Sequence, residues 1–267
     1  YACSDFKFKK GLVSATKTSG HTLQIADGLW LDKKFKAAMM KSIAQSELDR
    51  KRFVYSDIGF ILLQQVVEAV TGKTLDAYLV SEFYRPMGLE HTLFQPLNRY
   101  KKADIMPTAA NDYLRRQDLC GYVHDEAAAF MGGVSGNAGL FSTAQELGKI
   151  YQMILNEGEL DGKRYLRPET CRIFTTEKSA VSHRGLGYDK PNLKDPKANA
   201  CASSAPASVY GHTGFTGTCA WVDPENDLVY IFLSNRLCPD AWNGKLNSMK
   251  IRQAVQEVIY QSLYTPE

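Results

Sequence analysis

Two short segments of this chain carry residue types suited to acyl transfer. Acyl transfer by a serine enzyme needs a nucleophile, a base that takes its proton, and donors aimed at the developing oxyanion. Tyr55 could act as that base, although a phenol has a reference pKa near ~10 and needs cations that favour the phenolate. Asp57, two residues further on, could orient a neighbouring lysine or a substrate amide. The structural alternative is that Tyr55 packs and Asp57 caps the following helix.

The second segment is Gly211-His212-Thr213-Gly214. Glycine weakens a strand unless something must approach the backbone closely, and here that something could be a substrate lying along the strand edge. His212 and Thr213 would then offer donors to a substrate carboxylate. The structural alternative is a β-bulge with a satisfied surface histidine.

Helices must position the first segment. Apolar residues at three- and four-residue steps predict a buried helix that begins at Ser56 or Asp57 and ends at Gly72. A second helix, packed against the first, is predicted over residues 74–83. Similar apolar spacing predicts a helical stretch over residues 29–43.

A β-hairpin is predicted beside the second segment. Residues 217–222 and 228–235 are rich in β-forming side chains, and they flank a turn signal at residues 223–227. An amphipathic helix is predicted to close the chain over residues 251–263.

Irregular segments separate these elements. Residues 91–142 and 177–209 are predicted to be loops because of their prolines, glycines and polar residues. Between them, Thr143 and Glu146 fit a capping box that begins another helix. No repeat and no linker divides the chain, so we expect a single domain over residues 1–267, of α+β layer architecture.

Composition and charge argue against several classes of function. Of the 267 residues, 44% are hydrophobic and 23% are charged, and the formal net charge is +3. Lysine and arginine are scattered along the chain, which gives nucleic-acid binding no support. No apolar run reaches the ~18 residues of a membrane span. The six cysteines form no CxxC pair and are expected to be mostly free, buried thiols.

In chain order, these motifs resemble the class C β-lactamases and the related penicillin-binding-protein-like serine hydrolases. The resemblance covers roughly residues 50–263. The resemblance rests on four parts of the sequence. Residues 55–57 with 71–92 resemble the family's Tyr-x-Asn region, and 132–155 resemble its glycine-rich segment and the helix that follows. Residues 212–214 resemble its Lys-Thr-Gly strand, and 221–236 resemble its hairpin. The resemblance implies a β-lactamase/transpeptidase-like fold, with an antiparallel sheet flanked by helices and an all-helical region.

The resemblance also assigns roles to single residues. Tyr55 matches the family's catalytic tyrosine, Asp57 stands where asparagine is usual, and His212 stands where lysine is usual. Thr213-Gly214 completes the substrate strand, and the N–H of Phe215 matches one oxyanion donor. A neutral histidine lacks the fixed cation that recognises a β-lactam carboxylate. With these substitutions at residues 57 and 212, we expect the substrate to be an ester, an amide or a cell-wall peptide and not a β-lactam.

The family's nucleophile lies in a Ser-x-x-Lys motif at the start of a helix. Ser14 and Lys17 have this spacing, but the residues after Lys17 continue a buried helix poorly. We therefore expect the nucleophile to be missing, with a chain that is truncated at its N-terminus and inactive alone. An N-terminal region of the same polypeptide is the expected partner.

The function expected is that of a serine hydrolase that forms an acyl-serine intermediate on a small-molecule or peptidoglycan-type substrate, without a cofactor. The family implies a periplasmic or otherwise exported location. The rival hypothesis is a catalytically inactive module that binds a cell-wall peptide or glycan, which the departures at Asp57 and His212 favour. For His124-Asp125-Glu126 we expect a place in a pocket wall and no metal, because adjacent residues rarely converge on one ion.

Overall fold

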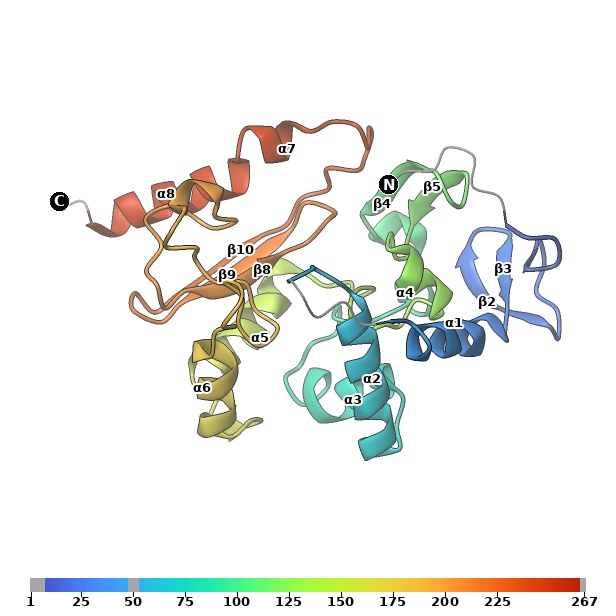
Figure 1. Cartoon of the computed structure of the whole chain (residues 1–267), viewed down its shortest axis with the longest axis horizontal. Coiled ribbons are helices and arrows are strands. Elements are labelled where there is room, and N and C mark those ends of the chain that lie inside the picture. The colour runs from blue at the N-terminus through green and yellow to red at the C-terminus, as the bar shows by residue number, and fades with distance from the viewer. Residues whose placement is uncertain (1–7, 48–52, 265–267) are drawn as a thin grey trace. The chain divides into compact units, whose positions relative to one another are not determined.

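The computed structural model describes residues 8–47 and 53–264 (Figure 1). They form two compact units. The first comprises the described residues up to 141 together with 237–241, and the second comprises 142–236 together with the described residues from 242 onwards. A single domain over residues 1–267 stays a prediction. Among the described residues, no helix has the length and apolar character that crossing a membrane requires.

The first unit contains two small antiparallel sheets and four α-helices among its described residues. One sheet has the strand order β1-β3-β2, and the other is the hairpin β4-β5. The elements are β1 (Val13–Ser14), β2 (His21–Ala26), β3 (Leu29–Asp32), α1 (Phe35–Ala44), α2 (Ile58–Thr71), α3 (Leu75–Leu79), a π-helical turn (Val80–Tyr84), β4 (Pro107–Asp112), β5 (Gln117–Cys120) and α4 (Glu126–Phe130).

Two expectations about where the helices and strands of this unit lie are wrong. The helix predicted over residues 29–43 begins only at Phe35, because residues 29–32 pair with both β1 and β2 as strand β3. Pairing with two neighbouring strands prevails over apolar spacing that also fitted a helix. The segment 91–142, predicted to be irregular, contains the hairpin β4-β5 and helix α4.

Helix α2 ends at Gly72 as predicted, and this C-cap residue is left-handed, but α2 is not a buried helix. Of its residues only Ile61 and Gln64 are buried. Its large apolar side chains include Leu63, which is 56% exposed, and Val70, which is 81% exposed. The apolar pattern therefore predicted the helix correctly and its burial wrongly.

The second unit contains a three-stranded antiparallel sheet of order β10-β9-β8. The predicted start of a helix after Thr143 is confirmed, since the Glu146 N–H donates to Thr143 Oγ1 (3.3 Å) at the N-terminus of α5. The elements are α5 (Ala144–Leu155), β6 (Glu159–Leu160), β7 (Lys163–Arg164), α6 (Pro168–Thr176), β8 (Tyr210–Thr213), β9 (Cys219–Asp223), β10 (Leu228–Phe232), α7 (Lys245–Ser248) and α8 (Ile251–Tyr264).

The sheet of the second unit lies between helices. Every residue of β9 is buried, which requires cover on both of its faces. Helix α8 lies along one side of the sheet and α5 along the other (Figure 1). From α8, Tyr260 reaches the core and donates a hydrogen bond to Asp223 Oδ2 (2.8 Å) on β9. The predicted hairpin and closing helix are thus confirmed, and they enclose the core of this unit.

The described cysteines are all free thiols, as expected, and Cys171, Cys201 and Cys219 are buried. Cys3 lies outside the described residues. Burial raises the pKa of Cys201 to about 12, so this thiol stays protonated in the core.

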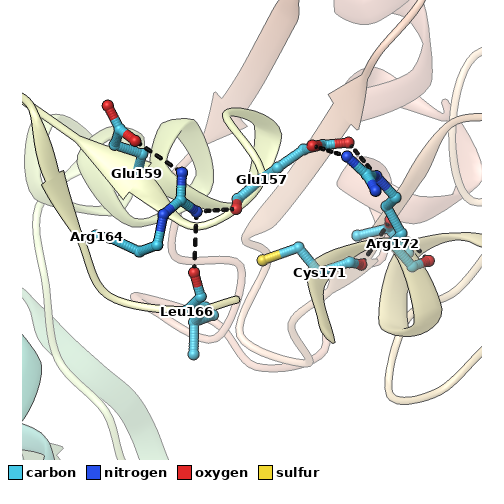
Figure 2. Close-up of polar contacts among 7 residues, drawn as sticks. Glu157, Glu159, Arg164, Leu166, Cys171 and Arg172 are labelled. Atoms are coloured by element: carbon cyan, nitrogen blue, oxygen red, sulfur yellow. Dashed lines mark hydrogen bonds and ion pairs between the residues drawn. The ribbon is translucent and has the colours of Figure 1, made fainter. Parts of the chain in front are cut away.

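An arginine network joins the small hairpin β6-β7 to α6 (Figure 2). Arg164 donates to the carbonyl oxygens of Glu157 (3.0 Å) and Leu166 (3.1 Å) and to Glu159 Oε2 (2.7 Å). Arg172 binds the Glu157 carboxylate through Nε (2.7 Å) and Nη2 (2.5 Å). The ion pairs among these side chains are exposed, so this network contributes orientation and little stability.

A buried lysine lies behind β8. Lys190 is 4% exposed; its ammonium donates to the Thr175 carbonyl oxygen and lies 5.7 Å from the centre of the Tyr210 ring. Burial, with a smaller effect of Lys178, lowers its pKa to about 8. Between pH 8 and ~10.5 the unfolded chain therefore binds more protons here than the folded chain, and the contribution of this group to stability rises with pH.

We expect Lys190→Met to stabilise the second unit below pH 8, where folding must bury a charge in the wild type. This gain should shrink as the pH rises towards ~10.5, where both states of the wild type lose the proton. Urea unfolding of both proteins at pH 7 and pH 10 measures the difference. A gain that is equal at the two pH values would contradict the assignment to Lys190.

Candidate active site

The six predicted site residues divide between the two units. Tyr55 and Asp57 belong to the first, and His212, Thr213-Gly214 and Phe215 belong to the second. Tyr55 lies before α2, outside any helix or strand, and is 56% exposed. Asp57 is the N-cap residue of α2. Their part in catalysis stays a prediction.

The buried side chain of Gln64 fixes α2 to the glycine-rich segment. Gln64 is 2% exposed. Its Oε1 accepts the Gly136 N–H (3.1 Å), and its Nε2 donates to the Val134 carbonyl oxygen (3.3 Å) and to Glu68 Oε1 (3.0 Å). The backbones of α2 and of the glycine-rich segment lie in close contact here, because a Cβ on Gly136 would lie 2.2 Å from the Phe60 carbonyl oxygen. Gln64 and Gly136 thus set the place of the helix that Tyr55 precedes.

The same glycine-rich segment is tied to α4. Asp125 Oδ1 accepts the Ala128 N–H (2.7 Å), which caps α4, and it also accepts Asn137 Nδ2 (3.0 Å). Ser135 Oγ in turn donates to Asn137 Oδ1 (2.7 Å). Asp125 is therefore a structural residue that fixes the glycine-rich segment to α4, as Gln64 fixes it to α2.

The neighbours of Asp125 serve the fold as well. The His124 carbonyl oxygen accepts Arg115 Nη2 (2.6 Å), and Arg115 forms a fully buried ion pair with Asp112 (Nε to Oδ1, 2.8 Å). Glu126 accepts a hydrogen bond from Tyr113 (2.5 Å). Among the described residues, no group of three or more His, Cys, Asp or Glu side chains could hold a metal ion.

The Ser14-x-x-Lys17 spacing does not fall on a helix. Ser14 ends the short strand β1, and its Oγ accepts the Thr16 N–H (3.3 Å). Lys17 lies with its ammonium 5.6 Å from the centre of the Trp30 ring. A serine on a strand is not followed by its lysine at one helical turn, so this pair lacks the geometry of the family's nucleophile motif.

Strand β8 holds His212 and Thr213 in regular register with β9. Gly211 faces Trp221, and His212 faces Ala220. A Cβ on Gly211 would lie 2.1 Å from the Ala220 carbonyl oxygen and 2.7 Å from the Trp221 ring. The close neighbour that requires this glycine is therefore strand β9, and the expectation that a substrate requires it is wrong.

Both ring nitrogens of His212 have partners. Nδ1 lies 2.7 Å from the Thr213 carbonyl oxygen, and Nε2 lies 3.0 Å from Arg184 Nη1. A guanidinium only donates, so Nε2 accepts and the proton sits on Nδ1, which donates to the carbonyl. His212 is thus neutral in this arrangement, and the cation beside the strand is Arg184.

Sequence reasoning missed Arg184, whose side chain lies with that of the exposed His183 against the buried Asp189. His183 Nε2 is 2.8 Å from Asp189 Oδ1, and Arg184 Nη2 is 3.3 Å from Asp189 Oδ2. Asp189 also exchanges backbone hydrogen bonds with Gly211 at the outer edge of β8. No pattern in the loop 177–209 revealed that these residues lie beside β8, because Asp189 and Gly211 are 22 positions apart and Arg184 and His212 are 28 apart.

The family follows from comparison with known proteins. The family model described as beta-lactamase matches residues 15–252. The chain belongs to the β-lactamase family. This confirms the predicted membership of the serine β-lactamase and penicillin-binding-protein-like hydrolases.

Individual relatives agree with this assignment. A putative D-alanyl-D-alanine carboxypeptidase of Escherichia coli K12 is 38% identical over 197 residues, which are 69% of this chain and 45% of that protein. A penicillin-binding protein homologue from Caulobacter crescentus has a TM-score of 0.53 at 19% identity, over 76% of this chain and 58% of that one. A β-lactamase from Mycobacterium bovis has a TM-score of 0.52 at 20% identity, over 79% and 64%. The two structures confirm the predicted fold class.

The chain spans about half the length of the curated relatives that it matches. The E. coli protein and one from Salmonella gallinarum, at 32% identity over 227 residues, have the same printed name.

Gly136→Ala is expected to destabilise the first unit by about 1–3 kcal/mol, because the added methyl group meets a backbone carbonyl that cannot rotate away. Gly59→Ala, in the helix α2 that Gly136 contacts, is the matched control. Nothing lies within 4 Å of a Cβ there, so this change should be neutral or stabilising. Thermal unfolding of both variants measures the difference, and equal melting temperatures would contradict the close approach of Gly136 to α2.

Proposed function

We propose that this chain supplies the proton-transfer tyrosine and the substrate strand of a serine hydrolase that acts on peptides ending in D-alanine. The reaction class is acyl transfer through an acyl-serine intermediate. Tyr55 would take and return the proton, β8 would hold the substrate, and the Phe215 N–H would stabilise the oxyanion. The relatives named as putative carboxypeptidases support this substrate class, as does the charge beside β8.

The observation that carries the proposal is the contact of Arg184 with His212. A peptidase that removes a C-terminal residue must recognise a carboxylate, and an arginine is the side chain best matched to that group. His212 cannot supply a charge while it accepts a hydrogen bond from Arg184. Arg184 therefore supplies at β8 the cation that the change from lysine to histidine removes from residue 212. Thr213 adds a hydroxyl donor to the same strand.

The nucleophile is proposed to lie in another part of a longer polypeptide. Ser14 has the wrong local geometry for the role. Helix α2 supports the proposal independently, because a helix with apolar residues on all sides is normally covered by protein. Leu62, Leu63, Val66 and Val70 are between 42% and 81% exposed. An apolar helix that carries the serine would cover this surface. Because the proposed substrate is a cell-wall peptide, we also propose an exported location.

The alternative function is a binding module without catalysis. The observation that favours it is the off-helix position of Ser14 and Lys17 in the part of the chain that the structure describes. Such a module would use the same cation at β8 to hold the peptide, and Tyr55 would have no role in it.

In a polypeptide extended to the length of the relatives, Tyr55→Phe is expected to lower ester turnover by ~10²–10⁴-fold, because a positioned proton-transfer group is lost. Tyr165→Phe removes the same hydroxyl from a tyrosine outside the proposed site and should leave turnover unchanged. A fluorophosphonate probe followed by intact mass would locate the serine. Unchanged turnover in Tyr55→Phe removes the tyrosine from the mechanism, and no adduct on the folded extended protein favours the binding module.

Arg184→Gln is expected to abolish a preference for carboxylate ligands. The wild-type chain should bind N-acetyl-D-alanyl-D-alanine about tenfold more tightly than the C-terminal amide of the same peptide, because a charge-assisted hydrogen bond is lost in the amide. Arg172→Gln, which removes an exposed arginine of α6, is the control and should keep the preference. NMR titration measures both affinities. A preference that persists in Arg184→Gln would show that another group binds the carboxylate.

A further inference from the structure

The turn that joins β8 to β9 is bound on its carbonyl side by two arginines. Residues 214–218 form this turn and include the proposed oxyanion donor, the Phe215 N–H. Arg252, near the start of α8, donates from Nη1 to the carbonyl oxygens of Thr218 (2.9 Å) and Gly214 (3.3 Å). Its Nη2 donates to Asn247 Oδ1 (2.9 Å). One guanidinium thus spans both ends of the turn.

Arg236 binds the middle of the same turn. Its Nε donates to the Phe215 carbonyl oxygen (2.6 Å), and its own backbone N–H donates to the Thr216 carbonyl oxygen (2.9 Å). The guanidinium carbon lies 4.3 Å from the centre of the Phe215 ring, which is 66% exposed. Every carbonyl oxygen from residue 214 to residue 216, and that of residue 218, therefore has an arginine donor.

These two positive charges lie close together. In the part of the chain that the structure describes, no carboxylate forms an ion pair with Arg236 or Arg252. Burial, and to a lesser extent the charge of Arg252, lowers the pKa of Arg236. Two like charges beside one turn cost free energy, which an anionic oxygen at the turn would offset.

The chemistry of the peptide group links these contacts to the proposed reaction. The Gly214 carbonyl and the Phe215 N–H are the two ends of one peptide group. A charged donor on the carbonyl oxygen draws electrons from the amide nitrogen, so the N–H becomes a stronger hydrogen-bond donor. Arg236 has the same relation to the next peptide group, through the Phe215 carbonyl and the Thr216 N–H.

We propose that Arg252 is a positioning residue for the oxyanion site: it fixes the turn and polarises the peptide group that ends in the Phe215 N–H. The inference rests on the proposed function for its role in catalysis. The polarisation itself is a property of the folded chain and needs no nucleophile. A purely structural Arg252 would join α8 to the turn without changing the donor strength of one particular N–H group.

The test is an amide ¹H–¹⁵N NMR spectrum of the chain with Arg252→Met, Arg252→Lys and Arg236→Met. Arg252→Met should shift the ¹⁵N resonances of Phe215 and Cys219, whose peptide groups contain the carbonyl oxygens of residues 214 and 218. It should leave Thr216 nearly unchanged. Arg252→Lys keeps a charged donor and should restore part of the wild-type shifts. Arg236→Met should give the complementary pattern, with Thr216 as the largest change.

Two results would overturn the polarisation. One is a Phe215 resonance that does not move in Arg252→Met; the other is a shift spread evenly over residues 214–219 that Arg252→Lys does not restore. The wild-type chain gives a second measurement that does not depend on whether the variants fold. A scalar coupling through the hydrogen bond, from Arg252 Nη1 to the Gly214 carbonyl carbon, is expected, and its absence would equally overturn the proposal.

The catalytic role is tested in the extended polypeptide. Arg252→Met should lower kcat by about tenfold with little change in KM, well short of the ~10²–10³-fold cost of removing an oxyanion donor. Arg252→Lys should recover part of this loss. A higher KM with unchanged kcat would overturn the catalytic role. If the wild type has no turnover, the proposed function fails, and the NMR spectra still decide whether Arg252 polarises the Phe215 N–H.

Discussion

The close approach of β8 to β9 at Gly211 is the constraint on which the second unit depends. No side chain fits at this position, because the Ala220 carbonyl oxygen and the Trp221 ring occupy the space. The glycine lets the indole of Trp221 lie over β8, and Trp221 belongs to the buried core that α8 closes. The register that results places His212 opposite Ala220 and brings the turn 214–218 under Arg252. The packing of one buried tryptophan thus determines where strand β8 ends.

A similar contact orders the first unit, with a backbone carbonyl in place of an indole. Gly136 lies so close to the Phe60 carbonyl oxygen that the position of the glycine-rich segment is fixed relative to α2. Gln64 supplies the polar half of the contact, and as a buried amide it must have partners for its donors and its acceptor. The segment is held again by Asp125 through Asn137. Tyr55 stands at the end of this chain of contacts and is itself exposed.

Local signals in the sequence predicted the elements that depend on local signals. The end of α2 at Gly72, the start of α5 after Thr143 and the hairpin around residues 223–227 are examples. Residues 29–32 could not be predicted, because their apolar spacing fits a helix and only pairing with two other strands selects the extended form. The prediction that α2 is buried was wrong for a related reason. An apolar pattern does not indicate which segment, if any, covers the helix.

The sequence did not reveal which side chain supplies the positive charge beside β8. Residue 212 alone suggested that the cation of the family's strand was lost, because a histidine stood in place of a lysine. Arg184 restores a cation to this strand from a loop without regular structure, 28 positions earlier in the chain. The guanidinium must be held in place, and Asp189 does this from a buried position while its backbone pairs with Gly211. A buried carboxylate that is shared between His183 and Arg184 orients the arginine and reduces its net charge. Any carboxylate that approached Arg184 would therefore compete with Asp189 for the guanidinium, so the proposed recognition at β8 requires a favourable balance of that competition as well as a positive charge.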